Sequence, residues 1–178
     1  DTMGKVLPYL HEARQRGVIL DVGHGAGSFC FRNAVPAIAQ GFYPDSISTD
    51  LHVLCMNQGM LDMVTTMSKF LVMGMPLSEV IRTSTINPAN EIGHPELGHL
   101  SLGAVADVAL LDVRSGHYGY TDSFGGKLPG TQRLFCELTL KDGEVVWDFN
   151  GRAGIDYQEL DSSYGIRLED FLIMPPKA

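Results

Sequence analysis

A short apolar run from Val18 to Val22 narrows the folds open to this chain more than any other segment. It is rich in β-branched residues and shows no polar alternation, as expected for a strand buried on both sides of a parallel sheet. Helical patterns flank it, from Lys5 to Arg16 and from Asn33 to Gln40, and Gly17 and Gly41 are natural ends for these helices. This order predicts α/β architecture.

A second strand is predicted from Asp45 to Asp50 and ends on a carboxylate. Leu61 to Met73 is strongly helical, and Ser78 is a plausible N-cap for a further helix that runs to about Thr83. Pro88 is expected to interrupt the helical pattern. Helix and strand therefore alternate through about the first ninety residues, which favours parallel strands.

The pattern changes after Gly93. Strands are predicted from Ala106 to Asp112, from Leu134 to Leu140 and from Glu144 to Asp148, and Asp142-Gly143 is a good hairpin signal between the last two. We therefore expect residues 1–92 to form the α/β part, 93–150 a small antiparallel β-unit, and 151–178 an irregular tail.

Composition excludes several classes of protein. Apolar residues make up 44 % of the 178 residues and charged residues 19 %, so a real core can form and global disorder is not expected. The net charge of −8, with no basic stripe, argues against nucleic-acid binding. No apolar run is long enough to cross a membrane. Three cysteines without CxxC spacing indicate reduced thiols and a cytoplasmic protein.

The loop Gly23–Ser28 follows the first strand and has three functional interpretations. It is close to a phosphate-cradling GxGxxG turn, but Ser28 replaces the third glycine and no P-loop lysine follows. It also resembles an esterase oxyanion loop, but no GxSxG elbow is present. Thirdly, His24 can contact a substrate or metal at a strand end, where Gly25 lets the backbone approach a ligand. The plain structural alternative is a tight turn with an exposed histidine.

The second strand ends in Ser48-Thr49-Asp50-Leu51-His52. An aspartate at this position can bind a metal and take a proton from water bound to it. His52 lies two residues further on and can reach a substrate. The structural alternative is that Asp50 is an N-cap or turn residue and His52 a surface residue. His94, His99 and His117 are predicted to be ordinary loop residues, and no HExxH motif or close ligand cluster occurs.

Together these segments resemble the amidohydrolase superfamily, and more closely its amidohydrolase/deacetylase, dihydroorotase-like branch. The resemblance covers about residues 5–150. The stretches that carry it are Arg16–Phe29, Pro44–His52, Thr85–Ala89 and Gly98–Asp112.

The resemblance implies a distorted (β/α)8 barrel with a β-sandwich. Val18–Val22 would be strand seven and Ile47–Asp50 strand eight, followed by a small part of the sandwich. It also implies hydrolysis of an amide or ester bond of a small acylated substrate, deacetylase-like, with one or two divalent metals, usually zinc. Asp50 matches the aspartate that binds a metal and transfers the proton, His24 and Gly25 lie near the substrate, and His52 lies beside the site.

Other family ligands are missing from this sequence: a strand-one HxH pair, a carboxylated lysine and two later histidines. We expect them upstream of Asp1. A catalytic zinc needs about three protein ligands, so the chain alone is expected to be inactive. Two barrel strands also leave unpaired edges, so we expect completion by an upstream segment or by association with another copy.

Two other hypotheses stay open. One is a non-catalytic α/β module that binds a phosphate or nucleotide at Gly23–Ser28. The other is a purely structural subunit that completes a partner's barrel.

Overall fold

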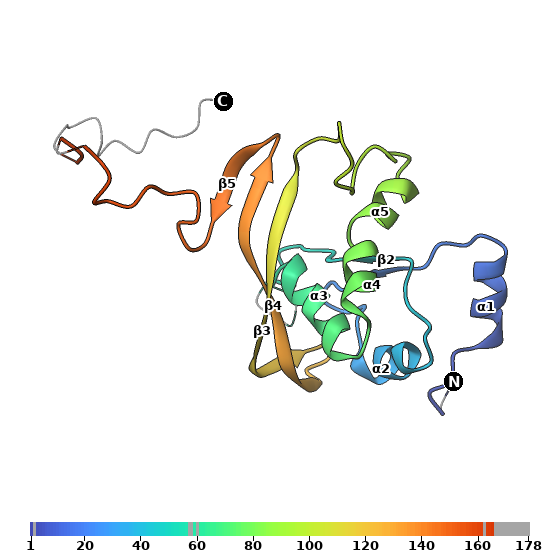
Figure 1. Cartoon of the computed structure of the whole chain (residues 1–178). Coiled ribbons are helices and arrows are strands. Elements are labelled where there is room, and N and C mark those ends of the chain that lie inside the picture. The colour runs from blue at the N-terminus through green and yellow to red at the C-terminus, as the bar shows by residue number, and fades with distance from the viewer. Residues whose placement is uncertain (2, 57–58, 60, 162, 166–178) are drawn as a thin grey trace.

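Two sheets of different kinds form the framework of the protein (Figure 1). A computed structural model describes residues 1, 3–56, 59, 61–161 and 163–165. One sheet is a parallel pair and the other has three antiparallel strands in the order β3-β4-β5. The strands are β1 (Asp21–Gly23), β2 (Ser46–Ser48), β3 (Val108–Thr121), β4 (Lys127–Lys141) and β5 (Glu144–Asp148). The helices are α1 (Pro8–Gln15), α2 (Phe31–Ala39), α3 (Met63–Val72), α4 (Leu77–Arg82) and α5 (Ile86–Glu91).

The parallel pair alternates its side chains between two faces. Val22 and Ile47 pack toward the helices, where Ile47 belongs to the buried core and Val22 lies against it. Asp21, Ser46 and Ser48 share the opposite face, because successive strand residues point to opposite sides. The sheet therefore has one apolar face covered by helices and one polar face.

Helix α3 lies against both sheets. It begins at the N-cap Asp62, whose carboxylate accepts a hydrogen bond of 2.6 Å from Thr65 N. Ser68 Oγ accepts another from Leu134 N of β4 at 3.0 Å, and Phe70 reaches the core beside the parallel pair. Ten buried residues form this core: Phe29, Phe31, Ile38, Ile47, Met67, Phe70, Met75, Val80, Tyr120 and Leu134.

The hairpin predicted at Asp142-Gly143 is confirmed. Lys141 pairs with Glu144, and the two loop residues have φ of 52° and 85°. Positive φ at both central residues is typical of the tight turns that suit the twist of antiparallel strands.

The first hairpin of the antiparallel sheet is much longer than predicted. Strands β3 and β4 have 14 and 15 residues, and His117 lies within β3, so its placement in a loop was wrong. Glycine and proline, here Gly116 and Pro129, commonly interrupt strands. However, the register shifts between Ser115 and Tyr118, and Pro129 pairs with a glycine near the strand ends. A bulge and a proline close to a hairpin end are compatible with a continuous ladder.

Other boundaries also differ from the prediction. The first strand spans only Asp21–Gly23, while Val18 and Ile19 are about half exposed, since β2 is the one strand paired with it among the described residues. Pro88 does not break a helix, because it lies in the first turn of α5, where backbone N–H groups have no partner inside the helix anyway.

The buried carboxylate of Glu137, on β4, binds the chain segment that follows β5. It accepts hydrogen bonds from Asn150 Nδ2 at 2.6 Å, from Arg152 Nε at 3.1 Å and from Arg114. Residues 151–161 and 163–165 contain no helix or strand, and the rest of the predicted irregular tail lies outside the described residues.

Candidate active site

The two parallel strands end at the same edge. Gly23 pairs with Ser48 at the end of the ladder. Beyond it, His24 N donates to Ser48 O at 3.3 Å and Gly25 N donates to Thr49 O at 3.0 Å. The two predicted motifs, 25 or so residues apart in sequence, are therefore adjacent. The same bonds occupy the first two loop amides, which leaves them unavailable to cradle a phosphate.

Gly23 lies at the centre of a polar cluster on the face opposite the helices. Asp21 accepts hydrogen bonds from Ser46 Oγ at 2.8 Å and from Ser48 Oγ at 2.7 Å. A Cβ on Gly23 would lie 3.5 Å from Ser48 Oγ and 3.6 Å from Asp50 Cβ. The carboxylates of Asp21 and Asp50 thus belong to one face of the sheet.

Asp50 is exposed and has a left-handed backbone, with φ of 48°. Its carboxylate lies against the backbone of Gly25, where an added Cβ would be 2.6 Å from Asp50 Oδ2. Gly25 is buried and also has a positive φ of 49°. Glycine is needed here for two reasons, since any side chain would be strained and would displace the carboxylate.

His52 lies in the turn that follows. Its ring is exposed, and Nδ1 accepts a hydrogen bond of 3.3 Å from Leu54 N. The thiol of Cys55 is buried under this turn and lies 3.1 Å from His52 N. The backbone of this turn is therefore fixed by its contacts with Cys55, while solvent can reach the ring of His52.

His24 is fully buried, which corrects the alternative of an exposed histidine in a tight turn. It continues the alternation of the strand and so lies on the helix side with Val22. Its ring stacks on Phe29 with centroids 4.6 Å apart, Nδ1 is 3.0 Å from Gly25 O, and Nε2 is 2.7 Å from Lys69 Nζ. Burial lowers the pKa of His24 below its ordinary value, and the Lys69 charge lowers it further.

Lys69 was not among the sequence-predicted site residues. It lies on α3 with no exposed surface, and Nζ donates to Thr121 O at 2.7 Å and to Gly59 O besides contacting His24. Burial lowers the pKa of Lys69 to about 8, against the opposing charge of Asp122. The signal for it was a lone lysine within a helix whose neighbours are apolar or small, since lysine is rarely fully buried without partners.

Asp122 supplies the nearby negative charge. Burial alone would raise its pKa, but hydrogen bonds from Phe31 N, Phe124 N and Gly126 N, 2.7 to 3.0 Å long, hold that pKa below the ordinary value. The buried cation and anion thus come from α3 and from the end of β3.

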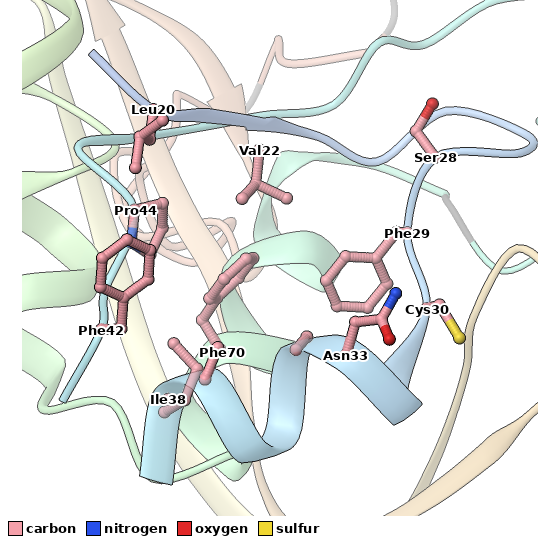
Figure 2. A pocket seen from close by; sticks show the side chains of 12 residues that line it. Leu20, Val22, Ser28, Phe29, Cys30, Asn33, Ile38, Phe42, Pro44 and Phe70 are labelled. Carbon is pink, nitrogen blue, oxygen red and sulfur yellow. The ribbon is translucent and has the colours of Figure 1, made fainter. Parts of the chain in front are cut away.

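An apolar pocket of about 230 Å³ lies between β1 and α2, on the side of the sheet opposite Asp50. Figure 2 shows Val22, Phe29 and Phe70 around it, with Asn33 among the few polar side chains. Its lining residues include the thiol of Cys30 but no carboxylate or histidine.

The described residues do not form a complete metal site by themselves. Within residues 1, 3–56, 59, 61–161 and 163–165, no group of three or more His, Cys, Asp or Glu side chains could hold a metal ion. Asp50 can therefore provide one ligand at most of the several that a catalytic zinc requires. In the same part of the chain, every helix is too short or too polar to cross a lipid bilayer.

Comparison with known proteins gives a consistent family assignment. The model of the amidohydrolase family matches residues 31–146, which is more than half of the chain. A protein of Brucella anthropi named deacetylase is 44 % identical over 119 residues, which are 67 % of this chain and 29 % of that protein. A deacetylase of Enterococcus faecalis is 34 % identical over 142 residues, covering 79 % of this chain and 38 % of its own length. The chain thus spans well under half of these relatives.

Two crystal structures share the fold. One, of an adenine deaminase, aligns with a TM-score of 0.78 and 30 % identity over 83 % of this chain and 40 % of that one. The other, of a dihydroorotase, aligns with a TM-score of 0.71 and 37 % identity over 77 % of this chain and 38 % of that one.

Proposed function

Because this chain belongs to the amidohydrolase family, we propose that it forms part of the active site of a metal-dependent hydrolase, with β1 and β2 as strands seven and eight of the catalytic barrel. Two observations support this. The strands are parallel and in register, and their carboxyl ends carry polar residues at one edge, where (β/α)8 enzymes place their catalytic groups. The antiparallel strands β3–β5 would then belong to the small β-sandwich portion.

Asp50 is the residue that carries the chemistry in this proposal. Its exposed carboxylate lies at the strand edge against the backbone of Gly25, and this contact is the observation on which the assignment rests. A divalent metal such as zinc, when bound, polarises the substrate carbonyl and acidifies water. Asp50 would be one ligand, would accept a proton from the attacking water, and would return it to the leaving nitrogen or oxygen. The remaining ligands come from outside the described residues.

The substrate we propose is a small acylated compound, cleaved at an amide or ester bond in the manner of a deacetylase. The names of the relatives from Brucella anthropi and Enterococcus faecalis support this class. Gly25 would form one wall of the substrate site, and the exposed ring of His52 could contact the acyl group or the leaving group. His24 would shape the same wall from beneath. The family match and the occupied loop amides favour this function over a phosphate-binding module.

The test is metal content by elemental analysis, together with acetate release from a panel of N-acetyl amino acids, on the natural full-length protein. We expect about one or two zinc ions per chain, and a fall in hydrolysis of at least about 10³-fold in Asp50→Asn, within the range of rate losses seen when a catalytic group is removed. The isolated 178-residue chain should hold no metal.

Asp142→Asn is the matched control, since Asp142 is also exposed and has a similar φ of 52°. It should keep metal and activity. A full-length protein without divalent metal, together with an Asp50→Asn variant of unchanged hydrolysis, would contradict the proposal.

A further inference from the structure

Lys69 contacts three segments that are distant in the sequence. Its Nζ lies 2.7 Å from His24 Nε2, in the loop after β1, and 2.7 Å from Thr121 O, at the end of β3. It also donates to Gly59 O, in the connection that follows Asp50 and His52. An ammonium group has three N–H donors, so the three acceptors account for all of them.

These contacts fix the state of the imidazole. Since Lys69 donates to Nε2 of His24, that nitrogen is unprotonated and the proton lies on Nδ1, from which it is donated to Gly25 O. Stacking on Phe29 holds the plane of the ring. Lys69 therefore sets the tautomer of His24, whose Nδ1–H is one donor to Gly25 O; Ser123 Oγ is another, at 3.3 Å.

The chain of contacts ends at the candidate catalytic carboxylate. Gly25 O accepts hydrogen bonds from the His24 ring and from Ser123 Oγ, and Gly25 N donates to Thr49 O at 3.0 Å. The carboxylate of Asp50 lies directly against this glycine. A shift of the Gly25 backbone would therefore change the space that Asp50 occupies.

We propose that Lys69 is a positioning residue, which acts through His24 and Gly25 to hold the carboxylate of Asp50 at the strand edge. The inference rests on the proposed function of Asp50.

The chemistry of Lys69 supports a specific role beyond filling space. Burying an ammonium group is costly, and an apolar side chain of similar size would fill the same volume at lower cost. The partners of Lys69 are the ring of His24, which precedes Gly25, and two loop or strand-end carbonyls, and the neighbouring Asp122 offsets the charge.

The experiment compares Lys69→Met with Ser68→Ala in the natural full-length protein. Methionine keeps the length of the side chain and removes its donors. Ser68→Ala is the matched control, because it breaks a buried contact between α3 and Leu134 of β4 but leaves the His24 loop intact. The measurements are the zinc dissociation constant, by competition with a chelator, and the ring ¹⁵N shifts of His24, identified by their absence in His24→Gln.

For Lys69→Met we expect zinc binding to weaken by about 10- to 100-fold, the range found when groups supporting a metal ligand are removed. Its His24 signals should move to a mixture of tautomers. Ser68→Ala should lower stability while zinc affinity and the ring shifts stay as in the wild type. Unchanged zinc affinity in Lys69→Met, with Asp50→Asn impaired, would overturn the positioning role and leave the proposed function intact.

The wild-type protein alone also tests the inference, so a variant that fails to fold does not end it. Its His24 must show a protonated Nδ1 and an unprotonated Nε2, and any other state overturns the proposal. If the wild type binds no zinc, the proposed function of Asp50 is wrong. The ring shifts of wild type and Lys69→Met then still show whether Lys69 sets the tautomer of His24 in the loop after β1.

Discussion

Raising the pH from 7 to 10 is expected to stabilise the protein relative to its Lys69→Met variant. Burial lowers the pKa of Lys69 from 10.5 to about 8 in the folded state. Between these two values the unfolded chain binds more protons at this site than the folded chain does. The free energy of unfolding therefore rises with pH across this window, because alkali relieves the cost of burying the charge.

The magnitude follows from the two pKa values. At 1.36 kcal/mol per unit, the shift from 10.5 to about 8 corresponds to roughly 3 kcal/mol in total. Most of that, roughly 2 to 3 kcal/mol, falls between pH 7 and pH 10. No reduction for solvent screening applies, since Lys69 has no exposed surface.

The assay is urea unfolding of wild type and Lys69→Met at pH 7 and pH 10. Taking the difference between the two proteins removes the titration of the groups that they share. Lys141→Met is the control: Lys141 is exposed, and its side-chain hydrogen bonds to Asp142 and Asp107 raise its pKa above 10.5. Folded and unfolded chains are therefore both protonated at this site from pH 7 to pH 10, and its contribution should stay nearly constant across that window. The charged, buried state of Lys69 would be refuted if the difference in free energy of unfolding between wild type and Lys69→Met changed by less than about 0.5 kcal/mol from pH 7 to pH 10.

Three further substitutions test other contacts. Gly25→Ala should lower the free energy of unfolding by about 1 kcal/mol and weaken zinc binding in the full-length protein, whereas Gly27→Ala, which meets open space, should change neither. Phe70→Ala should cost about 3–5 kcal/mol in urea unfolding, because Phe70 is fully buried, while exposed Phe124→Ala should stay within about 0.5 kcal/mol. Asp62→Ala removes the N-cap of α3, and we expect a loss of about 1 kcal/mol by thermal unfolding; an unchanged melting temperature would count against the cap.

The edge of the parallel pair was within reach of sequence analysis. The apolar run Val18–Val22 and the segment Asp45–Asp50 indicated two strands, and parallel strands place their ends together. The resemblance to the amidohydrolase superfamily is confirmed, as is an α/β fold of the metallo-hydrolase type. The numbering of the strands, the domain limits and the roles of His24 and His52 stay predictions.

The contact between His24 and Lys69 was out of reach because it depends on packing. The two residues are 45 positions apart, and periodicity says which face a residue occupies but not which residue it meets. The length of β3 and β4 could not be predicted for a related reason. Residues that disfavour strands, such as Gly116 and Pro129, are tolerated when the rest of the ladder is paired.

The position of α3 between the two sheets has a consequence for how the protein comes apart. A cut near residue 92 follows the change in sequence pattern, but it would take Tyr120 and Leu134 away from a core that they share with Phe70. The α/β segment would be left with an uncovered apolar face and Ser68 without its partner on β4. The change of architecture along the chain therefore does not divide it into two units that unfold separately. The two sheets should unfold in one cooperative transition.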